Sequence, residues 1–437
     1  MSLRSFLEKA RDSGRLMTIQ REVDPYLEMA TVIHNLGERP VLFERVGGRD
    51  CRVVAGLCGA RENFALDLGV DADRLLFTLN EALASPRPPD ILEAGICQEV
   101  VEEQVNLDQL PILTHLPLDG GPYVTAGVAV IKDPEYGRNV SIHRLLQIGP
   151  RQLVARIVES RGTETALGKT EGDLEVAVCI GNSLPVLLAA AMSPPPDVDE
   201  FSIANALRTT PLVRCLSVDL QVPAETEFVL EGRITSARAP EGPFLDLTGT
   251  MDIVREGHII EITRVTHRAD PIYQALLPGG REHKLLMGLP REPTIYAEVS
   301  KRCHCLNVLL TPGGASWLHA VVQVDKRDPD DGRRAVEAAF RGHSSLKHVV
   351  VVDGDIDIYD PHDVEWAIAT RFQAHTDLIV REDQPGSSLD PSAVHSPGKK
   401  TRTTKMGLDA TIPWRTPTGA LRSPEEREAF KRISYGK

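Results

Sequence analysis

The chain has 437 residues, of which 42% are hydrophobic and 25% charged, and this length predicts two or three domains. A formal net charge of -13 argues against a nucleic-acid surface, and no run approaches the ~20 apolar residues of a membrane span. Seven cysteines, odd in number and mostly in apolar runs, are typical of a reduced, cytoplasmic protein. We therefore expect a cytoplasmic protein with neither nucleic-acid nor membrane partners.

Residues 1–110 are predicted to form a mixed α/β domain. A helix is expected over 3–13, an extended segment over 16–23, a helix over 26–36, and short strands at 41–43 and 53–56. The segment 107–122 contains three prolines and is the first candidate for a domain boundary.

Residues 111–303 are strand-rich, which predicts a compact β-barrel or sandwich with inserted helices. The expected strands are 124–131, 140–147, 174–180, 212–220, 227–234, 253–263 and 266–267, and the expected helices are 184–192 and 199–209. Residues 304–437 return to alternating strands and helices, as in βαβ units: strands at 306–310, 317–324 and 348–353, and helices at 331–341 and 363–371. A short final helix is expected near 424–431.

Two carboxylates five residues apart, Glu241 and Asp246, flank a Gly-Pro pair that interrupts regular structure. Two close acids in a shielded site separate their pKa values, so one can donate a proton and the other accept it. Phe244 and Leu245 could exclude water from such a site. An acidic surface turn after a strand is the alternative interpretation.

A second polar segment precedes this one. If residues 140–147 form one strand, Asn139, Ser141 and His143 share a face and Arg144 lies on the other. An inward Arg144 would need an anionic partner such as a substrate carboxylate, a phosphate or Glu241, whereas a surface arginine would not. Glu200 has two interpretations as well: an acid in the first turn of a helix, or a ligand of a cation.

Four segments in order resemble the UbiD family of decarboxylases, which use prenylated FMN. They are the segment from Asn139 to Arg144, Ala189-Ala190-Ala191-Met192 with Glu200 eight residues on, Glu241-Gly-Pro-Phe-Leu-Asp246, and the run from Lys347 to Asp360. The resemblance extends over nearly the whole chain. It implies an FMN-binding split β-barrel between two α/β domains, with boundaries at 1–110, 111–303 and 304–437.

The resemblance also assigns roles to residues. Asn139 and Glu200 would bind Mn²⁺ (or Mg²⁺) beside the cofactor phosphate, carbonyls around Ala189, Ala190 and Met192 would bind K⁺, and Lys347 would reach the phosphate. Ser141, Ile142, His143, Arg144 and Met192 would contact the cofactor. Arg144 would hold Glu241 by a bidentate contact, and Asp246 occupies the place of the proton-transfer acid.

Two departures from the family pattern bear on these roles. Ser160 stands where many members have a histidine metal ligand, and Asp246 is one methylene shorter than the Glu of the fungal cinnamate-type enzymes. Which of Glu241, Asp246 and Glu282 donates the proton stays open.

The expected activity is reversible, non-oxidative decarboxylation of an α,β-unsaturated or (hetero)aromatic acid by cycloaddition to prenylated FMN. Furan dicarboxylate-like, phosphorylated enoic and hydroxybenzoate-like acids are candidate substrates, and Glu282, His283 and Arg291 are candidate contacts to them. A flavin prenyltransferase would supply the cofactor, and a homodimer or homohexamer is implied. The alternatives are an FMN-dependent reductase or oxidase on the same barrel, and a non-catalytic flavin-binding subunit.

Overall fold

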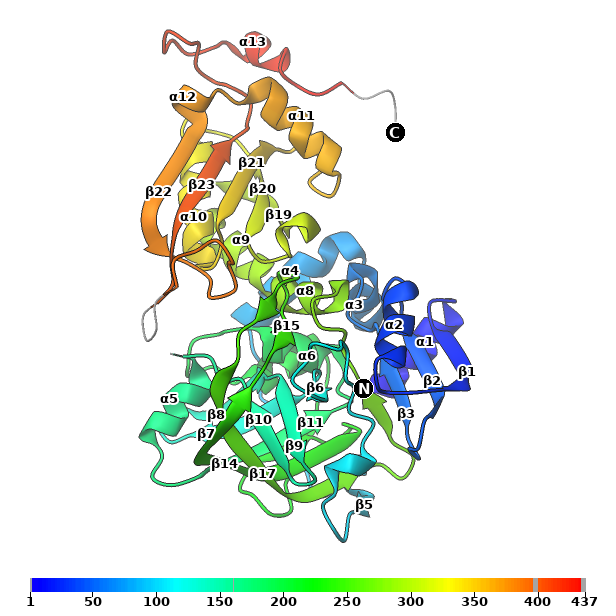
Figure 1. Ribbon diagram of the computed structural model, residues 1–437. Helices are drawn as coiled ribbons and strands as arrows, with labels where there is room; N and C mark the ends of the chain where they lie inside the picture. The colour runs from blue at the N-terminus through cyan, green and yellow to red at the C-terminus, as the bar shows by residue number, and fades with distance from the viewer. Residues whose placement is uncertain (1, 160, 396–399, 434–437) are drawn as a thin grey trace. The chain divides into compact units, whose positions relative to one another are not determined.

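The computed structural model describes residues 2–159, 161–395 and 400–433, and the chain divides into two compact units, Met1–Leu286 and Met287–Lys437 (Figure 1). Each unit is described by itself. The first contains an α/β part and a large antiparallel sheet, and the second is α/β. The mixed α/β and β composition expected from the sequence is confirmed.

The first unit is organised around a nine-stranded antiparallel sheet. Its pairing order is β6-β9-β10-β17-β14-β11-β7-β8, with β5 added beside β17. The strands are β5 (Val100–Val101), β6 (Tyr123–Val124), β7 (Val128–Asp133), β8 (Gly137–Ile142), β9 (Leu145–Gly149), β10 (Gln152–Ala155), β11 (Leu174–Ile180), β14 (Phe228–Glu241) and β17 (Arg255–His267).

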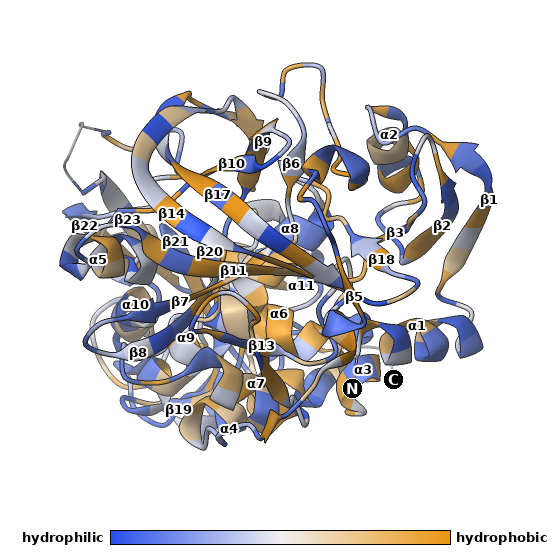
Figure 2. Cartoon of the chain, turned by 90° about the horizontal axis from the view of Figure 1, so that it is seen from below, coloured by the Kyte–Doolittle hydropathy of each residue, from blue (hydrophilic) through white to orange (hydrophobic). Residues whose placement is uncertain are grey.

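Two long paired strands give this sheet its curvature. The register of β14 against β17 shifts between Glu231 and Gly232 and again between Ile234 and Arg238, and such bulges bend a strand and increase its twist. A Cβ at Gly232 would lie 2.1 Å from the carbonyl oxygen of Glu261, so only glycine permits this approach. Figure 2 shows both strands curving across the sheet.

Several strand predictions differ from the structure. The segment expected as one strand over 124–131 is divided between β6 and β7, and the strand expected over 212–220 ends at Arg214. The strand expected over 140–147 is interrupted at His143 and Arg144, because β8 pairs with β7 whereas β9 pairs with β10 and β6. The strand expected over 227–234 continues to Glu241, so this acid ends a strand and does not lie in a turn. Two separate strands expected between 253 and 267 form one, β17.

The remaining elements of the first unit surround this sheet. A four-stranded sheet comprises β1 (Met17–Val23), β2 (Val41–Val46), β3 (Arg52–Ala55) and β18 (Ile272–Gln274), and a three-stranded one comprises β4 (Ile91–Leu92), β12 (Leu212–Arg214) and β13 (Gln221–Pro223). The helices are α1 (Leu3–Asp12), α2 (Glu28–Asn35), α3 (Arg61–Leu68), α4 (Leu75–Ala84), α5 (Gly162–Lys169), α6 (Leu184–Ala191) and α7 (Glu200–Leu207). Helix α6 packs against both α7 and β8, and β8 is an edge strand of the nine-stranded sheet. The helix pair α6 and α7 therefore lies at the β8 edge of that sheet.

The second unit is a five-stranded sheet in the order β19-β20-β21-β23-β22. Its strands are β19 (His304–Leu310), β20 (His319–Asp325), β21 (His348–Asp353), β22 (Leu378–Pro385) and β23 (Arg402–Asp409), and its helices are α9 (Glu292–Ser300), α10 (Asp331–Gly342), α11 (Pro361–Arg371), α12 (Ala374–Asp377) and α13 (Pro424–Glu428). Helix α8 (Arg281–Gly288) runs through the point where the two units are divided. The expected alternation of strand and helix is confirmed for β19 to α11.

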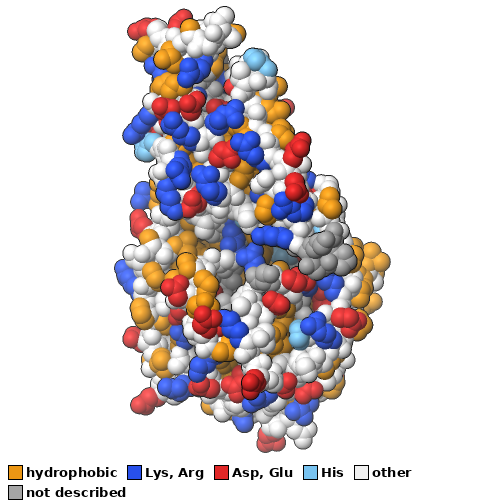
Figure 3. All heavy atoms as spheres, turned by 90° about the vertical axis from the view of Figure 1, so that its left-hand side faces the viewer, with side chains coloured by type: hydrophobic (Ala, Val, Ile, Leu, Met, Phe, Trp, Pro, Cys, Tyr) orange, Lys and Arg blue, Asp and Glu red, His pale blue; other side chains and the backbone are white. Residues whose placement is uncertain are grey.

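Apolar residues line the strands that pack in the interior, as the orange segments of β11, α6 and α7 show in Figure 2. On the face shown in Figure 3, acidic and basic side chains are interspersed over the surface. Among the described residues, no helix is both long and apolar enough to cross a membrane.

Candidate active site

Arg144 lies at the break between β8 and β9 and is the centre of a cluster of charged side chains. Its guanidinium donates hydrogen bonds to three carboxylates, those of Glu241, Asp246 and Asp252. The side chain is 10% exposed, so these contacts are made largely out of water. Burial lowers the pKa of Arg144, but the hydrogen bonds to Glu241 and the charges of the three acids raise it by more. The pKa of Arg144 therefore lies above its usual value.

Glu241 is the most tightly held of these acids. Arg144 Nε donates to Oε1 and Nη2 to Oε2, both at 2.9 Å, which is the bidentate contact predicted from the sequence. The phenol of Tyr123 donates to Oε1 at 3.1 Å, and Glu241 is fully buried. Burial raises the pKa of Tyr123, and the negative charge of Glu241 raises it further, so the phenol keeps its proton.

The chain turns sharply after Glu241. The Gly242-Pro243 bond is cis, and Gly242 has φ 107°, a backbone conformation that favours glycine. Behind this turn, the N–H of Gly120 donates to the carbonyl oxygen of Pro243 at 2.9 Å. A Cβ at Gly120 would lie 2.3 Å from the carbonyl oxygen of Gly242, so two glycines pack backbone to backbone here.

Asp246 follows a two-residue strand and is held less tightly than Glu241. Its Oδ2 accepts one hydrogen bond from Arg144 Nη1 at 3.0 Å, and its Oδ1 accepts the N–H of Leu247 at 2.6 Å. Its side chain is 14% exposed, compared with none for Glu241. Phe244 supports the guanidinium, because the Arg144 carbon Cζ lies 4.7 Å from the centre of its ring. The cluster therefore contains one fully buried acid and one partly exposed acid.

Asp252 is a member of the cluster that sequence reasoning missed. It lies on β16 (Met251–Asp252), which pairs with β15 (Phe244–Leu245), and its Oδ2 accepts from Arg144 Nη2 at 2.8 Å. The spacing from Phe244 to Asp252 permits a short hairpin, and this was the one local feature of the sequence that could have placed Asp252 near Asp246. Tyr123 was missed as well, since nothing in its neighbourhood in the sequence connects it to Glu241.

A second polar group joins β8 to α7. Asn139 Nδ2 donates to Glu200 Oε1 at 3.2 Å, and the N–H of Val140 donates to Oε2 at 3.0 Å. The other amide atom of Asn139, Oδ1, is buried without a hydrogen-bond partner among the described residues. A Cβ at Gly162 would lie 2.7 Å from this oxygen, so glycine leaves the space beside it open.

These atoms fit a hard cation. Burial raises the pKa of Glu200 to about 8 even though its carboxylate accepts the Val140 N–H and the charge of Arg138 acts in the opposite direction. An unpartnered amide oxygen beside a carboxylate is a donor set that Mn²⁺ or Mg²⁺ accepts. Ala189, Ala190 and Met192 lie at the end of α6, which packs against α7 and β8. Ser160 lies outside the described residues, so the expected change of ligand there stays a prediction.

Ser141, Ile142 and His143 complete the segment between the two clusters. The strand ends at Ile142, so His143 lies just beyond it and not on the strand as expected, although its side chain is on the same side as that of Ser141. The His143 ring contacts Ser141 Oγ through Nε2 at 3.0 Å and the carbonyl oxygen of Arg156 through Nδ1 at 3.1 Å. Burial lowers the pKa of His143, which keeps the imidazole neutral.

The candidate substrate residues are distributed over α8 and the second unit. Glu282 is fully buried, and both of its carboxylate oxygens accept main-chain N–H groups, those of Gly56 and Cys58, at 3.0 Å. Burial raises its pKa to about 7. His283 accepts the N–H of Gly279 at 3.1 Å. Burial lowers the pKa of His283, and the charges of Asp246 and Arg144 act on it in opposite directions.

Arg291 and Lys347 belong to the second unit. The guanidinium carbon of Arg291 lies 5.6 Å from the centre of a Trp317 ring. Lys347 Nζ pairs with Asp390 Oδ2 at 2.9 Å, so in this unit its charge is already balanced by a carboxylate. The phosphate contact expected of Lys347 stays a prediction.

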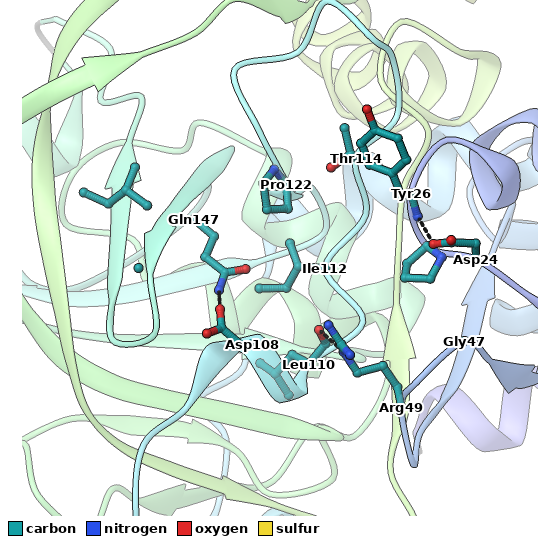
Figure 4. Close-up of a pocket in the computed structure, with 13 residues that line it drawn as sticks. Asp24, Tyr26, Gly47, Arg49, Asp108, Leu110, Ile112, Thr114, Pro122 and Gln147 are labelled. Carbon is teal, nitrogen blue, oxygen red and sulfur yellow. Dashed lines mark hydrogen bonds between the residues drawn. The ribbon is translucent and has the colours of Figure 1, made fainter.

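A cavity of about 530 Å³ in the first unit lies apart from both clusters (Figure 4). Its lining runs from Asp24 and Tyr26 to Gln147 and Gly149 and includes none of the candidate catalytic residues. Gln147 donates to Asp108 at 2.7 Å, and Asp24 accepts the N–H of Tyr26 at 2.7 Å. Gln147 and Asp108 thus bind each other and Asp24 binds a main-chain N–H, so these side chains give no indication of a ligand.

Sequence models of three domains of one family match the chain in order. They are the N-terminal domain (residues 7–83), the Rift-related domain (91–281) and the C-terminal domain (284–410) of 3-octaprenyl-4-hydroxybenzoate carboxy-lyase, UbiD. The chain belongs to the UbiD family. It is accordingly a carboxy-lyase, and the resemblance identified from four short segments is confirmed over nearly the whole length.

Individual UbiD-family proteins are similar over the full chain. Anhydromevalonate phosphate decarboxylase of Methanothermobacter thermautotrophicus is 42% identical, covering 94% of this chain and 97% of its own. The UbiD-class enzyme HmfF of Pelotomaculum thermopropionicum in complex with FMN is 40% identical with TM-score 0.92, covering 100% and 97%. An evolved dimeric form of HmfF with prenylated FMN is 38% identical with TM-score 0.88, covering 99% and 97%.

Proposed function

We propose that this UbiD-family enzyme decarboxylates a phosphorylated α,β-unsaturated acid, of the kind named for the relative from Methanothermobacter thermautotrophicus, with prenylated FMN as cofactor. The observation that carries the proposal is the buried cluster in which Arg144 holds Glu241 and Asp246. An exposed acidic turn would leave these carboxylates in contact with water, whereas this cluster keeps two acids close together with different exposure.

Several residues would hold the cofactor and its ions. Asn139 and Glu200 would bind Mn²⁺ or Mg²⁺ beside its phosphate, carbonyls around Ala189, Ala190 and Met192 would bind K⁺, and Lys347 would contact the phosphate. Ser141, Ile142, His143 and Arg144 would line the flavin. When bound, prenylated FMN supplies an azomethine-ylide-like centre that accepts the electrons released with CO₂.

Arg144, Glu241 and Asp246 have separate roles in this reaction. Arg144 orients Glu241 through two parallel hydrogen bonds and offsets negative charge at the substrate carboxylate. Asp246 delivers the proton that replaces CO₂ at the α-carbon, since it is the acid with fewer contacts and more exposure. His283 and Arg291 would contact the phosphate of the substrate, and Glu282 fixes the start of α8 through its main-chain contacts.

The proposal extends to the finer architecture. The curved nine-stranded sheet would be the split β-barrel of the FMN-binding domain, with domain boundaries near 110 and 303. A homodimer or homohexamer, a cytoplasmic location and a flavin prenyltransferase as source of the cofactor complete it. Seven reduced cysteines support the location, since all seven are free thiols in the described chain.

The test is a substrate screen with enzyme from cells that co-express a flavin prenyltransferase. Anhydromevalonate phosphate, furoic, cinnamic and hydroxybenzoic acids are supplied in turn, and CO₂ release and the mass of the bound flavin are measured. We expect release from the phosphorylated acid at a kcat/KM at least about 100-fold above the others, because a buried phosphate contact left empty is costly. Equal or better turnover of an unphosphorylated acid would contradict the substrate, and activity with unmodified FMN would favour the reductase or oxidase.

The metal site gives a separate prediction. Glu200→Gln and Asn139→Ala are each expected to weaken Mn²⁺ binding by about 10- to 100-fold, because each removes one oxygen ligand or its charge. Binding is measured by calorimetry on cofactor-free protein, together with the rise in Tm that Mn²⁺ produces. Glu171→Gln, a similar change at an exposed position, serves as the control. Unchanged Mn²⁺ affinity in both variants would place the metal elsewhere.

A further inference from the structure

Asp252, which contacts Arg144, also forms an ion pair with Arg255. Arg255 Nη1 donates to Asp252 Oδ2 at 2.5 Å, the same oxygen that accepts from Arg144 Nη2 at 2.8 Å. Arg255 is the first residue of β17 and pairs with Glu241 of β14, whereas Asp252 pairs with Phe244 in the β15–β16 hairpin. Both residues of the ion pair are therefore held by strand pairing. Asp252 is 15% exposed and Arg255 28%, so water screens their charges only in part.

The balance of charge in this cluster is unusual. Three carboxylates, those of Glu241, Asp246 and Asp252, surround two guanidiniums, those of Arg144 and Arg255, which leaves one negative charge in excess. Uptake of one proton on a carboxylate makes the cluster neutral. Asp252 contacts both guanidiniums. Burial raises the pKa of Asp252, but the hydrogen bonds and charges of the two guanidiniums outweigh burial and hold this pKa below its usual value.

The charged groups that face Asp246 come from several elements. Arg144 contacts Asp246 directly, and the charge of Asp246 acts on His283 of α8. Glu241 and Asp252 bind the same Arg144 guanidinium as Asp246. Burial lowers the pKa of His283, so that imidazole is neutral and adds no fixed charge.

Two groups lie further out. Tyr123 keeps its proton and donates to Glu241. Glu159 pairs with Arg156 on the exposed side and also feels the charge of Arg255.

We propose that Asp252 and Arg255 are positioning residues that set the protonation of Asp246 through Arg144, so that Asp246 carries the proton it donates. The negative charge of Asp252 offsets part of the effect that the positive charge of Arg144 has on Asp246. The positive charge of Arg255 in turn offsets part of the negative charge of Asp252. This proposal rests on the proposed function, in which Asp246 is the proton donor.

Opposite changes of charge give opposite shifts in the pH profile. Asp246 donates only when protonated, so activity falls as the pH rises through its pKa. Asp252→Asn removes the excess negative charge, which favours the ionised form of Asp246 and moves the alkaline limb of kcat/KM to lower pH by about 1 unit. Arg255→Gln removes a positive charge and moves that limb to higher pH by about the same amount.

The experiment compares pH profiles of kcat/KM for these variants in the holoenzyme. Arg255→Lys keeps the charge and is expected to restore the wild-type profile. Asp219→Asn and Lys132→Gln make the same charge changes in an exposed pair on the first unit and should shift nothing. Shifts of both test variants in one direction, or no shift in either, would overturn the proposal, because a merely structural role does not depend on the sign of the charge.

A second measurement is independent of turnover. Infrared difference spectra of each variant without substrate follow the C=O stretch of a protonated carboxyl group as the pH changes, and Asp246→Asn identifies the band. Its titration should move down in Asp252→Asn and up in Arg255→Gln, and a band that stays in place contradicts the proposal. If the wild-type enzyme decarboxylates none of the acids, the proposed function fails, whereas opposite shifts of this band would still support the pair's effect on Asp246.

Discussion

Glu241→Gln is expected to reduce kcat by about 100- to 10,000-fold while the cofactor still binds. The amide keeps the size of the side chain but loses the charge that Arg144 Nε and Nη2 contact at 2.9 Å. It also cannot accept both guanidinium hydrogen bonds and the Tyr123 phenol at once, because one oxygen becomes an NH₂ donor. Removal of a positioned acid or base from proton transfer typically has an effect of this size.

The measurement is single-turnover CO₂ release together with the flavin absorbance of the purified variant. Glu261→Gln, the same chemical change at an exposed position of β17, is the control and should retain full activity. Near wild-type turnover of Glu241→Gln would contradict the assignment of this cluster as the active site. Loss of bound flavin would instead show that Glu241 acts through the cofactor's binding.

Gly120→Ala is expected to reduce kcat by about 100-fold through the backbone alone. A methyl group there would lie 2.3 Å from the carbonyl oxygen of Gly242, and a backbone neighbour cannot rotate away as a side chain can. The turn after Glu241 must then shift, and a displacement of about 1 Å in a catalytic group can cost a factor of this size. We also expect a loss of about 1–3 kcal/mol in the free energy of unfolding from overpacking.

Steady-state kinetics and urea unfolding of the same preparation separate these effects. Gly168→Ala is the matched control, because Gly168 lies on an exposed part of α5 with nothing within 4 Å of the added methyl. That variant should be fully active and slightly more stable, as alanine favours helix over glycine. Full activity in Gly120→Ala would show that the turn tolerates the shift and that Glu241 is positioned by Arg144 alone.

Much of the fold followed from local patterns. The alternation of apolar runs with helical segments correctly predicted β19 to α11 in the second unit and β11 in the first. The pattern failed where a strand changes partners. Residues 140–147 contain no glycine or proline that would end a strand, and only the pairing of β8 with β7 and of β9 with β10 and β6 requires the break that directs Arg144 to Glu241.

The amino-acid sequence by itself determined the family and singled out Glu241 and Asp246, because both lie in a short motif of fixed spacing, and the resemblance to the family implied the pairing of Glu241 with Arg144. The tertiary structure decided the rest of the cluster. Tyr123 and Glu241 are 118 residues apart in the chain, and Asp252 lies 108 residues from Arg144, so no local pattern connects them. Their contacts form only when the curved sheet brings β6, β14 and the β15–β16 hairpin together, and a charge balance depends on such distances.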